Sequence, residues 1–127
     1  MPIVSKTTKG KKAVPRQKAA KAANKFIQLH VDMVVLPGRE SEMVSNFKKV
    51  FTPVISKQPG FVAVWLLKLR SALAGEVPGD AQYRLLISFK TEKQRLAWVA
   101  TDEHQEVWPS IANTLDGFKA YVYSSRG

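Results

Sequence analysis

The chain has 127 residues, a net charge of +10 and 45% apolar residues, which suits one globular domain and leaves no room for two. No apolar run reaches the roughly 18 residues that a membrane-spanning helix needs. The absence of cysteine excludes disulfides and thiolate chemistry, and it fits a cytoplasmic location.

The positive charge is concentrated at the start of the chain. Residues 1–25 hold eight Lys or Arg and no acidic residue, so the rest of the chain carries only +2 of the total of +10. Such a stretch buries too little apolar surface to fold, so we expect a disordered basic tail over residues 1–25 and a folded domain over residues 26–124. The tail is a weak, sequence-independent polyanion binder, a solubilising leader or a cleaved organelle presequence, although the excess of Lys over Arg fits a presequence poorly. The leader is favoured because no aromatic residue interleaves the lysines to stack on bases.

The domain is predicted to begin with a strand over residues 26–35, where apolar residues occupy every second position from Ile27 to Val35. Pro37-Gly38 ends this strand, and an apolar stripe at three- and four-residue spacing predicts a helix over residues 39–57. Pro53 removes a backbone donor, so the last turns of this helix should bend or loosen.

Two further strands are predicted over residues 61–70 and 82–90. The loop between them, residues 71–81, is longer than a tight hairpin turn, and long loops often cover sites. Thr91-Glu-Lys-Gln94 has the spacing of a capping box, which predicts a helix that starts there and ends near Ala100.

Another helix is predicted to start at Thr101, and Pro109 should break or kink it. Asp116-Gly117 is expected to turn the chain into a last strand over residues 118–124. The order strand–helix–strand–strand–helix–strand is the split βαβ plan of an α+β, ferredoxin-like domain with an antiparallel sheet. Because helices cover only one face of such a sheet, we expect a homodimer that forms through the other face.

Few side chains can support chemistry. The two histidines, His30 and His104, are too few for a zinc site with three or four ligands, and the seven glycines are too dispersed to cradle a phosphate. We therefore expect no metal and no cofactor. His104 is either a surface residue at a helix start or an acid–base group.

Three tryptophans, Trp65, Trp98 and Trp108, are the remaining signal. Their rings either pack in the core or line a pocket between sheet and helices that binds a flat, apolar ligand. Both interpretations can hold at once.

These landmarks together resemble the antibiotic biosynthesis monooxygenase domain of the dimeric α+β barrel superfamily. The matching residues are Leu36-Pro-Gly38, Pro59-Gly-Phe61, Trp98, Glu103-His104 and Trp108. The resemblance implies the barrel dimer and a family whose members include cofactor-free oxygenases of phenolic substrates, quinol-type oxygenases and haem-degrading enzymes. It also implies that Gln28, His30 and Asp32 face the partner subunit.

The haem-degrading branch has an Asn on the first strand, a Trp on the second helix and a His ten residues later. Here Val31 and Trp108 stand at the Asn and His positions, and only Trp98 matches. The resemblance therefore implies a monooxygenase without haem, acting on a small aromatic or quinol-like molecule.

Val31, Trp65, Trp98 and Trp108 are expected to line the substrate pocket, with loop 71–81 near its mouth. His104 and Tyr83 are the candidate catalytic acid–base groups. A non-catalytic dimer that binds a small apolar ligand, and a nucleic-acid-binding protein driven by the tail alone, remain the alternatives.

Overall fold

The structure is a computed structural model that describes residues 25–75 and 81–127. Within this range four strands form one antiparallel sheet, β1 (Ile27–Val35), β2 (Phe61–Lys68), β3 (Tyr83–Phe89) and β4 (Leu115–Ser124). Their order in the sheet is β2-β3-β1-β4. The predicted α+β, ferredoxin-like arrangement is confirmed. The predictions for the basic tail lie outside the described residues, Lys25 apart.

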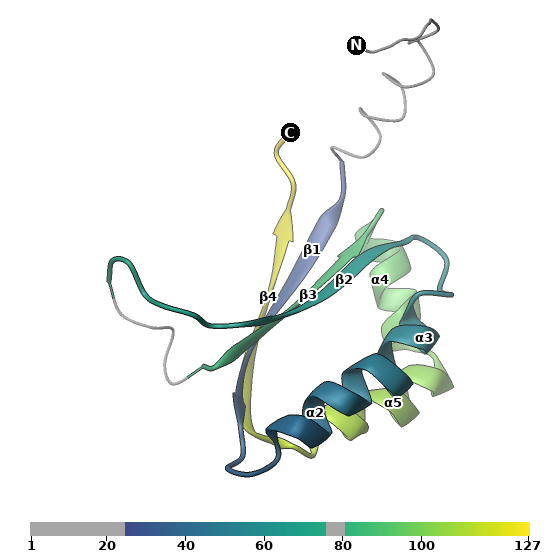
Figure 1. The fold of residues 1–127 in the computed structure, drawn as a ribbon. Coiled ribbons are helices and arrows are strands. Elements are labelled where there is room, and N and C mark those ends of the chain that lie inside the picture. Colours follow the sequence, from purple (N-terminus) through teal and green to yellow (C-terminus); the bar gives the residue numbers. More distant parts are fainter. Residues whose placement is uncertain (1–24, 76–80) are drawn as a thin grey trace, which may run out of the picture.

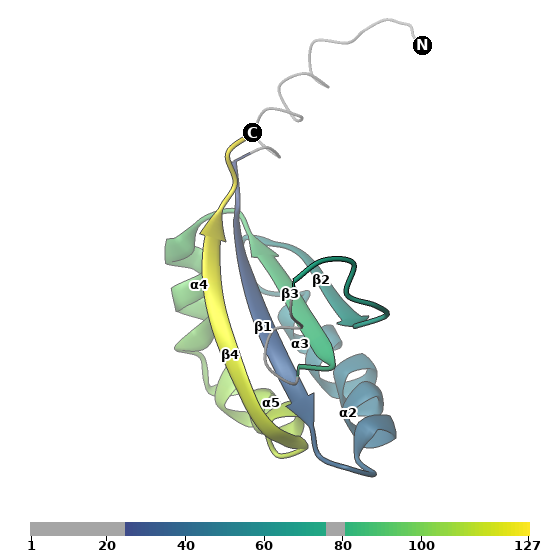
Figure 2. The ribbon, with the colours of Figure 1, turned by 90° about the vertical axis from the view of Figure 1, so that its left-hand side faces the viewer.

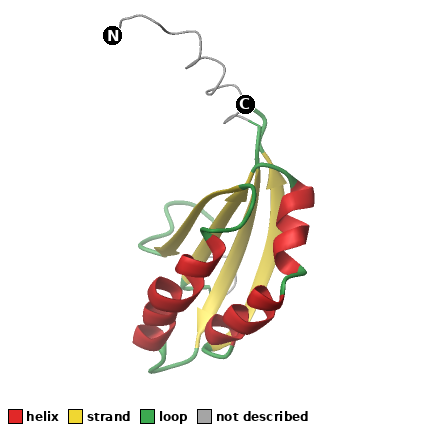
Figure 3. Ribbon diagram, turned by 90° about the vertical axis from the view of Figure 1, so that its right-hand side faces the viewer, coloured by secondary structure: helices red, strands yellow, loops and turns green. Residues whose placement is uncertain are grey.

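The helices lie on one face of the sheet, as Figures 1 and 3 show. They are α2 (Glu40–Asn46), a π-helical turn η1 (Phe47–Phe51), α3 (Thr52–Ile55), α4 (Glu92–Val99) and α5 (Asp102–Ala112). Figure 2 shows the opposite face, which no described element covers. Among the described helices, none has the length and apolar character to cross a membrane.

The first helical region changes its winding before Pro53, as predicted. The Thr52 amide donates to the Phe47 carbonyl, five residues back, and α3 then starts with Pro53 in its first turn. Proline has no N–H to donate four residues back, so the chain loses an α-helical hydrogen bond here. The wider turn places Phe51, which is 1% exposed, toward the sheet.

Two threonine caps fix the starts of α4 and α5. The Thr91 hydroxyl oxygen accepts a hydrogen bond from the Gln94 amide at 3.1 Å, and the Thr101 hydroxyl oxygen accepts one from the His104 amide at 3.1 Å. Both predicted helix starts are confirmed. Of the break or kink predicted at Pro109, the break is wrong, because α5 continues through Pro109 to Ala112.

The start of β4 also differs from the prediction. The strand begins at Leu115, and Asp116-Gly117 lies within it instead of turning the chain. Val34 pairs with Gly117 and Val35 with Leu115, so Asp116 is an extra residue opposite a shift in register. A bulge accommodates one additional residue without ending the strand.

The uncovered face of the sheet carries polar side chains that bond to one another. His30 Nε2 donates to Gln28 Oε1 at 2.7 Å, and Gln28 Nε2 donates to Ser88 Oγ at 3.1 Å. Arg84 holds both oxygens of Asp32, at 2.6 and 3.2 Å. Gln28, His30 and Asp32 thus share the face that the sequence predicts, and each has a partner within the protomer.

Candidate functional site

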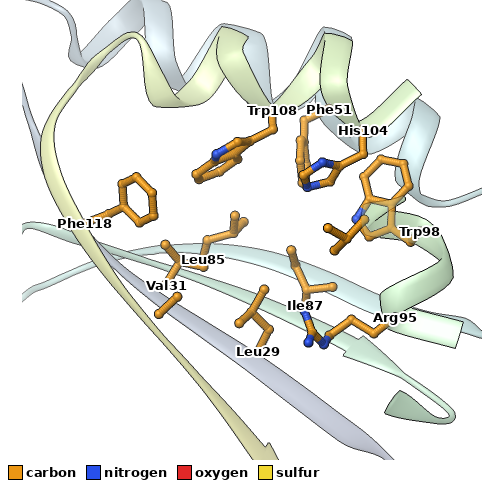
Figure 4. A pocket seen from close by; sticks show the side chains of 12 residues that line it. Leu29, Val31, Phe51, Leu85, Ile87, Arg95, Trp98, His104, Trp108 and Phe118 are labelled. Atoms are coloured by element: carbon orange, nitrogen blue, oxygen red, sulfur yellow. The ribbon is translucent and has the colours of Figure 1, made fainter. Parts of the chain in front are cut away.

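A cavity of about 190 Å³ lies between the sheet and helices α4 and α5. Figure 4 shows side chains from both layers converging on it. The lining residues are Leu29, Val31, Phe51, Leu85, Ile87, Arg95, Trp98, Val99, His104, Trp108, Phe118 and Ala120. Most of this lining is apolar, and only Arg95 and His104 are ionisable or charged.

Aromatic rings form the helical wall of the cavity. The Phe51 ring meets Trp98 and Trp108 edge-on, with centroid distances of 6.1 and 6.3 Å, and Trp108 meets Phe118 at 5.4 Å. Such edge-to-face contacts add to the stabilisation from burial. Trp98 is only 3% exposed. It therefore belongs to the core and lines the cavity at the same time, and its role in binding a ligand stays a prediction.

His104 is held in this wall by the start of α5. The Thr101 cap fixes its backbone, and its ring meets Trp98 edge-on at 5.0 Å. Its Nδ1 atom is buried and has no hydrogen-bond partner among the described residues. Because Nδ1 is enclosed by protein, hydrogen bonding with a bound molecule falls to Nε2.

Burial lowers the pKa of His104 below its ordinary value of 6.5. The charged form would place a second N–H in an apolar wall without an acceptor, and desolvation disfavours it. His104 is therefore neutral at pH 7.

Arg95 is a functional candidate that the sequence analysis missed. Its Nε and Nη2 atoms donate to the two oxygens of Glu92, each at 2.7 Å, and its side chain is only 13% exposed. In Figure 4 its guanidinium reaches from α4 toward Leu29 and Ile87 of the sheet. The available signal was spacing, because Arg95 precedes Trp98 by three residues and so shares its helix face.

Three of the four predicted pocket residues line the cavity together, namely Val31, Trp98 and Trp108. Trp65 does not. It pairs with Leu86, while its neighbour Val64 pairs with Ile87 of the cavity wall. Since successive residues of a strand point to opposite faces, Trp65 lies on the uncovered face, where it is 61% exposed.

Tyr83 also lies outside the cavity. Its hydroxyl donates a hydrogen bond to Glu40 at the start of α2, and Lys68 binds the same Glu40 oxygen at 2.7 Å. Burial and the bond to Glu40 raise the pKa of Tyr83 to about 12. The hydroxyl therefore keeps its proton at neutral pH and joins β3 to α2.

The remaining site predictions concern the loop and a metal. Of the predicted covering loop, the described residues 71–75 and 81 do not line the cavity, and residues 76–80 lie outside the described part of the chain. Within the described residues no group of three or more His, Asp or Glu is placed to hold a metal ion.

The sheet order and the one-sided helical layer define an α+β, ferredoxin-like domain. No protein-family model and no curated protein sequence matches the chain, whereas solved structures do. A protein from Bordetella bronchiseptica, provisionally described as an antibiotic biosynthesis monooxygenase, superposes with a TM-score of 0.64 at 16% identity, covering 78% of this chain and 95% of its own.

Two further structures are similar over nearly their full lengths. SnoaB, a cofactor-independent oxygenase from Streptomyces nogalater, has a TM-score of 0.65 at 17% identity and covers 81% of this chain and 95% of its own. A dimeric ferredoxin-like protein of unknown function from Jannaschia sp. CCS1 has a TM-score of 0.66 at 12% identity and covers 77% and 97%. The predicted resemblance to antibiotic biosynthesis monooxygenases is thus confirmed at the level of the fold.

Proposed function

We propose that the domain is a cofactor-independent monooxygenase of the antibiotic biosynthesis monooxygenase family that oxidises a small phenol or quinol-like ring in this cavity. The observation that carries the proposal is His104, a neutral imidazole in the wall of an otherwise apolar, aromatic-lined space. Fold alone does not specify activity, so the proposal depends on this site.

The size of the cavity limits the substrate. An engineered apolar cavity of about 150 Å³ binds benzene, and the cavity here measures about 190 Å³. It therefore suits one ring or two fused rings, whereas a three-ring anthrone would need the wall to move.

The reaction needs no redox partner other than O₂. A phenol with a free para C–H position combines with one O₂: one oxygen atom becomes the second carbonyl of a para-quinone, and the other leaves as water. The phenol O–H and the para C–H are broken, the substrate loses four electrons, and O₂ gains them. The ring supplies every electron, so the protein has only to hold it, exclude water and assist proton transfer.

His104 Nε2 is the group proposed to receive the phenol proton, which requires the neutral tautomer that carries its proton on the buried Nδ1. Because its pKa is lowered, the imidazole is unprotonated at neutral pH and available as an acceptor. The rival function, a binding module without catalysis, predicts a pocket lacking ionisable groups. The presence of His104 and Arg95 in the lining favours the enzyme.

The test is oxygen uptake with 1-naphthol and 2-alkylphenols, which have a free para C–H position, compared with anthrone. We expect uptake with the one- and two-ring compounds, para-quinone formation from 1-naphthol, and little uptake with anthrone. A protein whose uptake does not exceed that of a heat-denatured sample on the whole panel would refute the proposal.

We also propose that a second copy of the chain covers the uncovered sheet face. Trp65 and Leu67 of β2 and Tyr121 and Tyr123 of β4 are all exposed on that side, at the two edges of the sheet, and groups of large exposed apolar side chains mark interaction surfaces. Sedimentation at micromolar concentration should find a dimer, and Trp65→Lys should weaken it. A monomer throughout would refute this proposal.

Two earlier expectations remain predictions. If residues 1–25 bind polyanions weakly, the full chain should shift nucleic acid at low salt more than residues 26–127 do. The cytoplasmic location can be checked by fractionation of the source cells.

A further inference from the structure

We propose that Arg95 binds the oxygen of the substrate, so that the cavity takes a phenol in its anionic form. This inference rests on the proposed function for its substrate class, but it concerns binding and not the reaction with O₂.

The first argument is the position of the guanidinium. Arg95 is one of two polar side chains in the cavity lining, and it points toward Leu29 and Ile87 across the space (Figure 4). A buried cation in apolar surroundings interacts strongly with an anion because the local dielectric is low.

The second argument is the set of donors that Arg95 leaves free. Glu92 accepts from Nε and Nη2 only, along one edge of the guanidinium. No hydrogen bond from Nη1 is made to any described residue. Since a guanidinium has five donors in a fixed plane, Glu92 orients the group while its other edge can bind a ligand oxygen.

The third argument is the weakness of His104 as a base. Its pKa lies below 6.5, whereas an ordinary phenol, like a tyrosine, ionises near a pKa of about 10. Its Nδ1 has no acceptor that would stabilise the imidazolium. His104 therefore needs help to deprotonate a phenol, and an opposite charge within about 4–6 Å lowers an acid's pKa by about 1–3 units.

Elsewhere on the chain a second arginine–glutamate pair provides a matched control. Arg39 holds Glu42 through the same two atoms, Nε and Nη2, at 3.0 and 2.8 Å and with the same three-residue spacing. Arg39 is 37% exposed and does not line the cavity. Arg39 also donates from Nη1 to the Asn113 carbonyl at 2.6 Å, so the two pairs differ in burial, in the cavity and in the use of the outer edge of the guanidinium.

The experiment uses 4-nitrophenol, whose ionised form is coloured and whose para position is blocked, so no quinone can form. Absorbance is titrated against pH for the free and the protein-bound phenol. Binding to the full chain should lower the ionisation midpoint by about 1 pH unit, equivalent to about tenfold tighter binding of the anion than of the neutral phenol. The proton passes to the buffer.

Three variants test whether Arg95 causes the shift in the ionisation midpoint. Arg95→Gln should abolish the shift, and Arg39→Gln should leave it unchanged. Glu92→Gln removes the competing carboxylate charge and should enlarge the shift. If Arg95→Gln fails to fold, two other variants still test the inference. Arg95→Lys keeps a positive charge and should keep part of the shift in the ionisation midpoint. Glu92→Gln should still enlarge that shift.

Several results would overturn the inference. They are no binding of 4-nitrophenol, a bound midpoint equal to or above that of the free phenol, a shift that survives Arg95→Gln, and a smaller shift in Glu92→Gln. A shift without oxygen uptake from reactive phenols would keep this inference and refute the monooxygenase. Uptake without a shift would do the reverse.

Discussion

His104 and Tyr83 lie in two regions of the molecule that differ in whether the polar side chains have hydrogen-bond partners. In the region around Tyr83, the hydroxyl, Glu40 and Lys68 bind one another. In the cavity, His104 Nε2 makes no hydrogen bond to the described residues, and Arg95 leaves one edge of its guanidinium unused. Satisfied polar groups stabilise a fold, whereas unsatisfied ones beside a cavity are where a ligand gains most.

Tyr83 and His104, which the sequence offers equally as acid–base groups, therefore have different roles. Tyr83 fastens β3 to α2, and its raised pKa keeps it protonated. His104 faces a space that a small ring could fill. The following predictions test this difference, beginning with the largest effect.

Truncating the cavity wall should cost the most stability. Trp98→Ala removes a ring that is 3% exposed, and we expect the free energy of unfolding to fall by about 3–5 kcal/mol. Urea unfolding measures the loss. On the same helix, Leu96→Ala removes a side chain that is mostly exposed, and it should cost less than about 1 kcal/mol. Normal stability in Trp98→Ala would show that the ring is not part of the core.

Replacing the cavity imidazole should affect rate more than stability. His104→Gln removes the proton acceptor, and we expect oxygen uptake with 1-naphthol to fall by about 10²-fold or more. Tyr83→Phe is the matched variant, since it removes a hydroxyl outside the cavity, and its uptake should match that of the unmodified protein. Equal losses in the two variants would contradict the distinction between the two regions.

Removing the Tyr83 hydroxyl should affect stability alone. Tyr83→Phe loses the hydrogen bond to Glu40, and we expect a loss of about 1 kcal/mol in the free energy of unfolding. The pKa of Tyr83 is raised from 10 to about 12 in the fold. Stability should therefore fall as pH rises from about 10 toward 12, and this alkaline loss should shrink in Tyr83→Phe. If Tyr83→Phe loses as much stability at alkaline pH as the unmodified protein does, Tyr83 is not the group responsible.

The smallest expected effect is a loss of stability at acid pH. Burial lowers the pKa of His104 below 6.5 in the fold, so between that pKa and 6.5 the unfolded chain binds more protons. Stability is then present in full above pH 6.5 and decreases as pH falls through the folded pKa. Oxygen uptake should decrease as pH falls through the folded pKa, because protonated His104 cannot accept a proton.

The pKa of His30 is also lowered, first by burial and then by the charge of Arg84. His30→Gln should therefore remove part of the acid-side loss of stability and leave the pH dependence of oxygen uptake unchanged. His104→Gln should remove the remainder. If the decrease of oxygen uptake at low pH disappears in His30→Gln, the proton acceptor is His30 and not His104.

Local patterns in the sequence were enough for most of the fold. The threonine caps, the alternation in β1 and the apolar stripe of the first helix each depend on neighbours within about four residues, and all were confirmed. The break expected at Pro109 and the turn expected at Asp116-Gly117 are absent where packing or strand pairing overrode a local signal.

Only some of the residues that line the cavity could be predicted from the sequence. Trp98 and Trp108 share helices with clear apolar faces, whereas Trp65 was assigned to the wrong side of the sheet. Both faces of β2 are apolar, so its sequence does not show which alternate residues face the helices. The register of its pairing with β3 determines this. Arg95 was missed because a charged residue on a helix is usually on the solvent face.

The order of the elements, the one-sided covering of the sheet and the small number of possible catalytic groups could all be predicted from the amino-acid sequence. These follow from periodicity, capping and composition, which act over short stretches of chain. Only the tertiary structure decided that His104 and Arg95 line one cavity while Tyr83 and Trp65 lie outside it. The physical reason is that burial and charge pairing depend on residues far apart in the chain, as Tyr83 and Glu40 illustrate.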